Sequence, residues 1–367
     1  MILLLTIVAA AVWLAFANGA NDNFKGVATL YGSNTATYKG ALWWATIATF
    51  AGSLASIFAA KELVVTFSGK GLVPDGLAGS PEFAATVGLG AAFTIFLATR
   101  LGMPTSTTHA LIGGLLGTSV AANAQIGHEI LVSKFAIPMF SSPLLAICLA
   151  ALLYLLFTRL RQRMGVDKRT CVCFADGSMQ AVRDGDVMFV ESTGVRLTVG
   201  QTQECVERYD GAVVGVDAQT ALDGMHYLSA GAVCFSRAVN DTPKITALLL
   251  TTAALDAASG LAVIGVAMIV GGITQARRVA ETMSKHIADL NAGQGFTANV
   301  TTAGLVLLAS NFGLPVSTTH VSCGSIFGIG IANKSCRWRT VSQILTAWIT
   351  TLPTAALLSA LLYMLIS

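Results

Sequence analysis

Two eight-residue stretches carry the same polar pattern between apolar runs of the chain. They read Gly102-Met-Pro-Thr-Ser-Thr-Thr-His109 and Gly313-Leu-Pro-Val-Ser-Thr-Thr-His320, and six of the eight positions are identical. Downstream, the glycine pair Gly113 and Gly117 is matched by Gly324 and Gly328. A match this specific, 211 positions apart, indicates an internal repeat that the chain uses twice.

The hydroxyl groups of these stretches predict an anion-binding site. Pro104 and Pro315 suit the first turn of a helix, so we expect the Ser-Thr-Thr that follows to lie within that turn. Unpaired backbone N–H groups and the positive end of the helix dipole attract anions there. Two opposed cradles would suit a small tetrahedral oxyanion, although back-bonding of hydroxyls to helix carbonyls is the alternative. The predicted substrate-binding hydroxyls are those of Ser106, Thr107, Thr108, Ser317, Thr318 and Thr319.

A second repeated motif follows the first apolar run of each half. It reads Asn21-Asp22-Asn23-Phe24-Lys25 and Asn240-Asp241-Thr242-Pro243-Lys244. A carboxylate at membrane depth is costly and usually faces a polar cavity or a cation. Asp22 and Asp241, with Asn21 and Asn240, therefore offer oxygen ligands for a small hard cation such as Na⁺. The alternative is that Lys25 and Lys244, three residues on, pair with these carboxylates by helical spacing.

His109 and His320 end the two hydroxyl motifs. A histidine at such a position either packs and caps its helix or donates a hydrogen bond near the site, and both its neutral and its charged form can donate. The sequence leaves both roles open.

The composition identifies the class of protein. Of 367 residues, 54% are hydrophobic and 11% are charged, whereas a soluble domain carries about 25% charged residues. We therefore expect a polytopic membrane protein, with no cleavable signal peptide because a basic n-region is missing. A net charge of +3 without basic runs between aromatics argues against nucleic-acid binding. The seven scattered cysteines predict no disulfide framework. A metal site of Cys171, Cys173, Cys205 and His226 is a weak alternative because of its loose spacing.

The apolar runs fall into two sets of five. A bilayer span needs about 20 mostly apolar residues. Basic residues that follow the fifth, seventh and ninth runs lie on one side of the membrane if each half has five spans. An odd number of spans then inverts the second half, so we predict an all-α polytopic membrane protein with an inverted-topology repeat, broken helices and a site between the halves. The predicted spans are 1–17, 40–60, 83–100, 104–122 and 134–157, then 226–239, 256–273, 296–311, 315–333 and 341–366.

A polar segment separates the two halves. Residues 165–224 hold ten of the nineteen acidic residues, and short alternating stretches between turn residues predict small β-hairpins. We therefore divide the chain into a first transmembrane repeat at 1–160, a cytoplasmic β-rich insert at 161–225 and a second, inverted repeat at 226–367. The charged segment Thr274–Leu290 has apolar residues at helical spacing, which predicts either a helix along the membrane interface or an extended end of the preceding helix.

These motifs together resemble the inorganic phosphate transporter (PiT) family. The resemblance rests on Gly19-Ala-Asn-Asp22, Asn240-Asp241 and the two P-x-S-T-T-H stretches. It implies an inverted-repeat carrier of the cell inner membrane, often a homodimer, that moves inorganic phosphate with Na⁺ or, in some bacterial members, with protons. It also implies that the six hydroxyl residues bind phosphate, and that the Asn-Asp pairs serve the anion and coupling-cation sites.

The chain departs from the family pattern at four positions. Many members carry Asn where Lys25 and Lys244 stand, and some carry acidic residues at the positions of Thr49 and Asn299. These changes remove negative charge and add positive charge near the predicted site. Our hypothesis is that the lysines partly replace bound Na⁺ or contact phosphate, with weak or proton-based coupling.

Three other functions were compared with phosphate transport. Another oxyanion carrier, chiefly of sulfate, or of arsenate as a phosphate mimic, is the nearest alternative. An enzyme is disfavoured because no nucleophile elbow, metal-spaced histidine cluster or phosphate loop is present in the sequence. A channel would not need two gated halves with separate anion and cation ligands.

Overall fold

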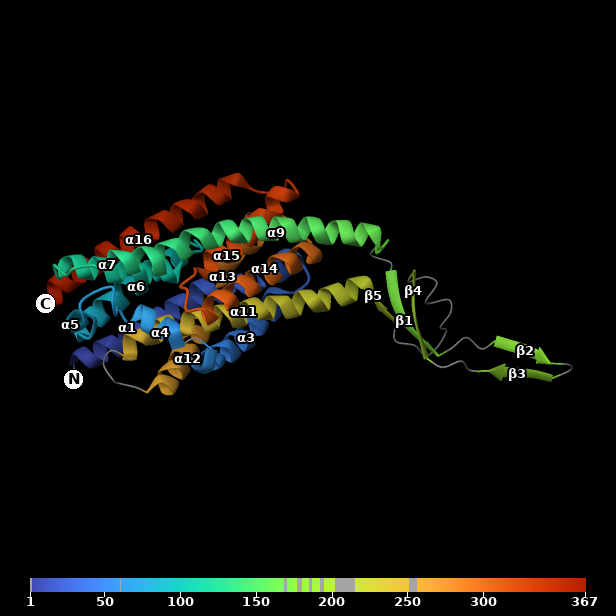
Figure 1. The fold of residues 1–367 in the computed structure, drawn as a ribbon, viewed down its shortest axis with the longest axis horizontal. Coiled ribbons are helices and arrows are strands. Elements are labelled where there is room, and N and C mark those ends of the chain that lie inside the picture. The colour runs from blue at the N-terminus through green and yellow to red at the C-terminus, as the bar shows by residue number, and fades with distance from the viewer. Residues whose placement is uncertain are drawn as a thin grey trace. The chain divides into compact units, whose positions relative to one another are not determined.

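The computed structural model describes residues 2–59, 61–167, 170–176, 180–184, 187–191, 195–201, 215–250 and 256–367. Within this part the chain is mostly helical and forms two compact units (Figure 1). One unit comprises Met1–Tyr154 and His226–Ser367, and the other comprises Leu155–Met225.

Each of the ten predicted spans contains a helix. Their ends differ from the predicted ones, because α1 continues through Asp22 and α11 continues to Leu250. In the first half the helices are α1 (Ile2–Asp22), α2 (Ala28–Gly32), α3 (Tyr38–Ala59), α4 (Lys61–Phe67), α5 (Asp75–Ala78), α6 (Pro81–Arg100), α7 (Thr107–Ala121), α8 (His128–Ile130) and α9 (Ile137–Arg163). In the second half they are α11 (Ala218–Leu250), α12 (Ala257–Gln275), α13 (Arg277–Glu281), α14 (Ala292–Asn311), α15 (Thr318–Ala332) and α16 (Trp338–Ile366). A 3₁₀ turn at Lys25–Val27 and π-helical turns at Leu131–Ala136 and Thr282–His286 link some of them.

Several helices are long and apolar enough to cross a membrane. Within the described residues five segments meet that description. They are Ile2–Gly32, Pro81–Arg100, His128–Arg163, Ala258–Gln275 and Trp338–Ile366. The expectation of a polytopic membrane protein agrees with this finding.

The two halves repeat element by element. The bounds of α14 and α15 follow those of α6 and α7 at a constant shift of 211 positions. The turn before each hydroxyl motif holds a glycine in the left-handed region, with φ of +69° at Gly102 and +64° at Gly313, where a Cβ would be strained. The same backbone solution at both copies indicates that the repeat extends from sequence to local geometry.

The glycine pairs of the repeat allow helices to approach closely. Carbonyls of α16 at Leu352 and Ala356 lie where Cβ atoms on Gly113 and Gly117 of α7 would be, so neither glycine can gain a side chain without a shift. In the same way Gly324 and Gly328 of α15 lie against carbonyls of α9 at Pro143 and Ile147. Small residues at four-residue spacing commonly mediate such packing in membranes. The motif helix of each half therefore packs on the last helix of the other half.

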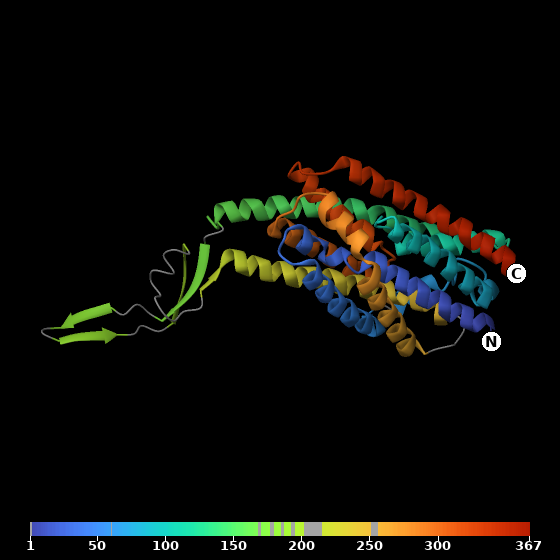
Figure 2. The same ribbon diagram turned by 180° about the vertical axis from the view of Figure 1, so that it is seen from behind.

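The helices enclose separate clusters of buried apolar side chains. α1 contacts both α6 and α12, and the N- and C-termini lie at the same end of the helical unit (Figure 2). The largest cluster of buried apolar residues includes Leu14, Phe83, Ile95, Leu111 and Leu248. A second cluster includes Phe24, Val279, Met283, Phe327 and Ile344.

The segment Thr274–Leu290 is not a single interfacial helix. Within this segment α12 ends at Gln275, and α13 and the π-helical turn Thr282–His286 follow it. Its apolar side chains, Val279, Met283 and Ile287, are buried inside the protein because α2 lies against the π-helical turn. The helical spacing was real, but the apolar face packs on protein.

The described residues of the second unit include five short strands. β1 (Thr170–Asp176) pairs antiparallel with β4 (Val195–Gln201) and with β5 (Gly215–Asp217), giving the order β4-β1-β5. β2 (Gln180–Asp184) pairs antiparallel with β3 (Val187–Glu191).

Candidate functional site

All predicted site residues are buried in the helical unit. None of the fourteen is more than 6% exposed. Charged side chains buried this deeply must find partners among neighbouring groups, because an unpaired buried charge costs several kcal/mol. The contacts of these residues therefore define the site.

The serines of both motifs cap the helices that follow them. The Ser106 hydroxyl accepts from the His109 backbone N–H, and the Ser317 hydroxyl accepts from the His320 backbone N–H, both at 3.2 Å. Because each serine captures the third helical amide, α7 and α15 begin at the next threonine. Pro104 thus precedes the helix, as does Pro315, and the prediction that the prolines occupy the first turn was wrong.

Lys25 joins the two halves of the protein. Its ammonium group lies 2.5 Å from Asp22 Oδ1 and donates to the Thr319 hydroxyl at 2.6 Å. It also donates to the Thr105 carbonyl at 2.7 Å, and the Thr319 hydroxyl donates to that same carbonyl. A lysine of the first half therefore binds a motif hydroxyl of the second half.

Lys244 makes the matching contacts from the second half to the first half. Its ammonium group lies 3.3 Å from Asp241 Oδ1 and donates to the Thr108 hydroxyl at 2.8 Å. It donates to the Val316 carbonyl at 2.9 Å, which also accepts from Thr108. The Asp–Lys pairing by helical spacing is thus present in both copies, and the two lysines cross between the halves.

Asn18 links the two carboxylates. Its amide nitrogen donates to Asp22 Oδ2 at 3.2 Å and to Asp241 Oδ2 at 3.4 Å, so both aspartates lie around one side chain. It also donates to the Thr107 hydroxyl at 2.8 Å. Thr107 and Thr318 in turn donate to the Oδ2 atoms of Asp22 and Asp241 at 3.4 Å. Oxygen atoms of both repeated motifs therefore meet at one place.

The two asparagines of the Asn-Asp pairs brace the loops before the motif helices. The Asn21 amide donates to the Met103 carbonyl, and its Oδ1 accepts from the Thr105 N–H at 3.0 Å. Asn240 donates to the Val316 carbonyl at 3.1 Å. Their side chains position the cradle backbone in this structure.

The two motif histidines touch each other. The rings of His109 and His320 have centroids 4.3 Å apart, and the Trp348 ring stacks on His320 with centroids 3.7 Å apart. His109 Nδ1 lies 2.8 Å from the Ser106 hydroxyl. The histidines thus pack against each other between the two caps, and His109 also contacts its own cap.

The sequence analysis missed Arg237. It is the largest fully buried side chain of the described chain, and its guanidinium donates to Asn18 Oδ1 and to Thr49 Oγ1, both at 3.0 Å. A lone arginine in an apolar run is itself a signal of a polar partner at membrane depth. Comparison of the two halves adds a second signal, because Arg237 and Asn18 both stand four residues before the motif aspartate.

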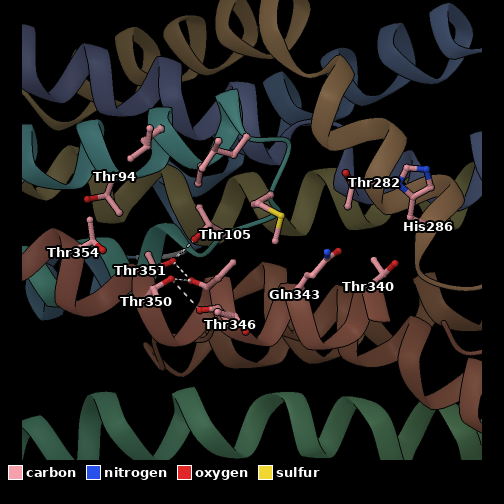
Figure 3. A pocket seen from close by; sticks show the side chains of 15 residues that line it. Thr94, Thr105, Thr282, His286, Thr340, Gln343, Thr346, Thr350, Thr351 and Thr354 are labelled. Carbon is pink, nitrogen blue, oxygen red and sulfur yellow. Dashed lines mark hydrogen bonds between the residues drawn. The ribbon is translucent and has the colours of Figure 1, made fainter. Parts of the chain in front are cut away.

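A threonine-lined pocket reaches the site from one side. Its volume is 640 Å³, and hydroxyl groups from α6, α16 and the π-helical turn line it (Figure 3). At its inner wall the Thr105 hydroxyl is hydrogen-bonded to that of Thr351. The Thr105 carbonyl is the acceptor for Lys25, so a single residue separates the pocket from the buried charges. Labelled lining residues are Thr94, Thr105, Thr282, His286, Thr340, Gln343, Thr346, Thr350, Thr351 and Thr354.

The weak metal-site alternative finds no support in the described residues. No group of three or more His, Cys, Asp or Glu side chains there could hold a metal ion. His226 is buried in the helical unit, with Nε2 3.0 Å from the Thr29 hydroxyl. Cys205 lies outside the described residues.

Residues 18–359 match the model of a family described as the phosphate transporter family. A protein of Rhizobium meliloti named as a probable low-affinity inorganic phosphate transporter is 29% identical, over 98% of this chain and 96% of its own. A protein of the same description from Mycobacterium leprae is 28% identical, over 99% of this chain and 78% of its own. A solved structure titled "The sodium-dependent phosphate transporter" shares the fold, with a TM-score of 0.77 and 20% identity over 100% of this chain and 99% of that one.

Proposed function

The chain belongs to the phosphate transporter family, and from this membership and the site geometry we propose that it is a secondary-active carrier of inorganic phosphate in the cell's plasma membrane. The observation that carries the proposal is the crossed pair of lysines. Each lysine binds the motif hydroxyl of the opposite half, next to a capped helix N-terminus. A tetrahedral anion between the halves would meet two ammonium groups, hydroxyl donors and backbone N–H groups together. The family is one of transporters, so an enzymatic reading is set aside.

The proposed architecture is an inverted-topology repeat. Two observations support this architecture. The helix bounds of the two halves match at a constant shift, and each motif helix packs on the last helix of the other half. We divide the chain into a first repeat at 1–160, a β-rich insert at 161–225 on the cytoplasmic side and a second repeat at 226–367. Opposed copies of one half bring equivalent helix ends to a shared site, as alternating access requires.

The proposed phosphate ligands are the motif hydroxyls. Thr108 and Thr319, which now contact the lysines, face the opposite half and are the first choice for the anion. Thr107 and Thr318 lie beside the carboxylates. The remaining proposed phosphate ligands are the capping serines Ser106 and Ser317 and the bracing amides of Asn21 and Asn240.

The proposed coupling groups are Asp22 and Asp241. Carboxylates surrounded by hydroxyl and amide groups can bind Na⁺ or accept a proton. Lys25 and Lys244 already neutralise part of their charge, which lowers the need for a bound cation. His109 and His320 are proposed to hold the two helix caps at a fixed distance.

The proposed access route is the threonine-lined pocket. Its hydroxyl groups can replace water around a hydrated anion, and it ends at Thr105 beside Lys25. Movement of the Thr105–Thr351 contact would connect the pocket with the site.

Uptake of labelled phosphate by the purified full-length protein in liposomes tests the function. We expect saturable uptake driven by an ion gradient, competition by arsenate and weak competition by sulfate. The Lys25→Met and Lys244→Met double variant should lose uptake. The exposed variant Lys334→Met is the matched control. Sulfate uptake faster than phosphate uptake would favour the alternative, and non-saturable flux would indicate a channel.

The resemblance also implies a homodimer. Cross-linking of the protein in native membranes checks this, with a band of twice the chain mass as the expected result. A purely monomeric pattern under conditions that cross-link a known membrane dimer would contradict it.

A further inference from the structure

Arg237 breaks the symmetry of the site. The two halves match at a shift of 219 positions around the aspartates, which relates Asp22 to Asp241 and Lys25 to Lys244. At this shift Asn18 corresponds to Arg237. The first half therefore supplies a neutral amide where the second half supplies a cation, although their neighbours make matched contacts.

The guanidinium of Arg237 lies among oxygen atoms that suit a small cation. Asn18 Oδ1 and Thr49 Oγ1 each accept from it at 3.0 Å. Asn23 Oδ1 lies one hydrogen bond further, at 2.8 Å from Thr49 Oγ1. Amide and hydroxyl oxygens are ligands that hard cations accept. In this chain the guanidinium of Arg237, a cation that is part of the protein, binds those of Asn18 and Thr49.

Asn18 connects this cation to the carboxylates. Its Oδ1 accepts from Arg237, while its Nδ2 donates to both aspartates. A charge at Arg237 thus acts on Asp22 and Asp241 through one rigid amide. The arrangement places a third positive group beside the two crossed lysines.

The buried charges of the described chain do not balance. The buried charged residues there are Asp22, Asp241, Lys25, Lys244 and Arg237, which give a net charge of +1 in their ionised forms. A net buried charge is unfavourable by several kcal/mol unless an ion of opposite sign joins it. Dihydrogen phosphate would bring the sum to zero. Hydrogen phosphate or sulfate, as a dianion, would leave −1 and need one further cation or proton.

We propose that Arg237 is a resident cation of the transport site, whose guanidinium holds the oxygen ligands of Asn18 and Thr49 in place of a bound Na⁺. The carrier then moves phosphate as the monoanion, or as the dianion with one proton, without Na⁺ at this position. The same charge count disfavours sulfate, which carries no proton near neutral pH. This inference rests on the proposed function and specifies its coupling.

Phosphate uptake in liposomes, with NaCl or choline chloride outside, tests the proposal for the wild type, Arg237→Asn and Arg237→Lys. The asparagine variant recreates the residue of the matched position, whereas the lysine variant keeps the charge. For the wild type and for Arg237→Lys, the rate of uptake should be the same in NaCl as in choline chloride. For both proteins the rate should rise as the pH is lowered. Arg237→Asn should transport at least about tenfold faster in NaCl than in choline chloride, because Na⁺ bound at the vacated oxygen ligands would restore the missing positive charge. The control Arg277→Asn removes an exposed arginine and should match the wild type.

Thermal unfolding of the full-length protein in detergent gives a second readout that does not depend on transport. At equal ionic strength, Na⁺ should stabilise Arg237→Asn and leave the wild type unchanged. Wild-type uptake that requires Na⁺, or equal Na⁺ stabilisation of wild type and Arg237→Asn, would overturn the proposal. Absence of phosphate uptake in every variant would instead refute the proposed function, and the unfolding data would still decide the role of Arg237.

Discussion

The residue scale is governed by the pairing of buried charges. Lys25 and Lys244 each satisfy a carboxylate of their own half and a hydroxyl and a carbonyl of the hydroxyl-motif regions. Pairs of this kind contribute little net stability, but loss of one partner is costly because it leaves the other charge buried and unpaired. We therefore expect the lysines to be needed for the fold as well as for the proposed anion site.

The variant Lys244→Met should strongly destabilise the protein. It leaves Asp241 without its ammonium partner, at a cost of about 3–5 kcal/mol. The double variant Lys244→Met with Asp241→Asn should regain most of that stability, since neither member of this pair is left as an unpaired charge. Thermal unfolding of the four proteins of this cycle measures the coupling. Equal stability of the single and double variants would refute the pairing argument.

The variant Thr319→Val should impair transport more than it impairs stability. It keeps the side-chain shape but removes the hydroxyl that accepts from Lys25 and donates to the Thr105 carbonyl. We expect phosphate uptake to fall by about tenfold, since a hydrogen bond to a charged group is worth about 1.5–3 kcal/mol. Thr302→Val is the matched control, because its buried hydroxyl contacts Ser325 and no lysine. Equal effects of the two variants would count against a ligand role for Thr319.

At the scale of elements, two glycine pairs determine how the halves combine. The α7 glycines lie against carbonyls of α16, and the α15 glycines lie against carbonyls of α9. The steric demand is on backbone atoms, which cannot rotate away as a flexible side chain can. The hydroxyl motifs lead into α7 and α15, which carry these glycines. The packing of α7 and α15 therefore determines where the site lies.

Gly117→Leu should therefore disrupt the protein. Its new side chain would overlap the Ala356 carbonyl and separate α7 from α16, at a cost well above the usual 1–3 kcal/mol of overpacking. Gly304→Leu in α14 is the control, because a Cβ there meets no atom within 4 Å. The amount of folded protein extracted from membranes and its unfolding temperature measure the effect. Comparable yields of the two variants would contradict the packing argument.

The threonine-lined pocket gives a prediction for α16. Gln343→Cys in its wall should react with a small charged thiol reagent, and phosphate uptake should fall as it reacts. Ser342→Cys is the neighbouring exposed position of the same helix and lies outside the pocket lining, so its reaction should leave uptake unchanged. The wild type reports any effect of the native cysteines. Unchanged uptake after full modification of Gln343→Cys would exclude the pocket as the route.

At the scale of the whole molecule, the helical unit contains the complete site. Each of the fourteen site residues, and Arg237 with them, lies in Met1–Tyr154 or His226–Ser367. The second unit supplies none of them. From this separation we expect the insert to be dispensable for the proposed transport.

Replacement of residues 165–224 by a short flexible linker should preserve phosphate uptake within about twofold, since the site residues and their partners all remain. Uptake in liposomes at equal amounts of reconstituted protein measures this. A matched replacement of the loop before α6, which carries the Ser80 cap, should reduce the amount of folded protein. Loss of uptake by a well-folded insert variant would assign the insert a role in transport.

Much of this organisation could be predicted from the sequence because it depends on repeated local patterns. The hydroxyl motifs, the Asn-Asp-Lys motifs and the apolar runs place the helices and most buried polar residues correctly. The start of α7 was misplaced because the choice between Pro104 and Ser106 as the helix start depends on which amide the serine captures. Arg237 was missed although a lone arginine in an apolar run signals a polar partner at membrane depth. Its actual partners, Asn18 and Thr49, are brought to it only by the folded chain.

The packing of each motif helix on the last helix of the other half has a consequence for biogenesis. As the chain leaves the ribosome, α7 enters the membrane with Gly113 and Gly117 facing no partner, because α16 lies far downstream in the sequence and is made later. The first half must wait, with its glycine face uncovered, until α16 has been made. We expect chains truncated before Trp338 to be retained by membrane quality control and degraded, and co-expression of α16 as a separate peptide to rescue them. Pulse-chase turnover of the truncated chain measures this, and a stable truncated protein would contradict it.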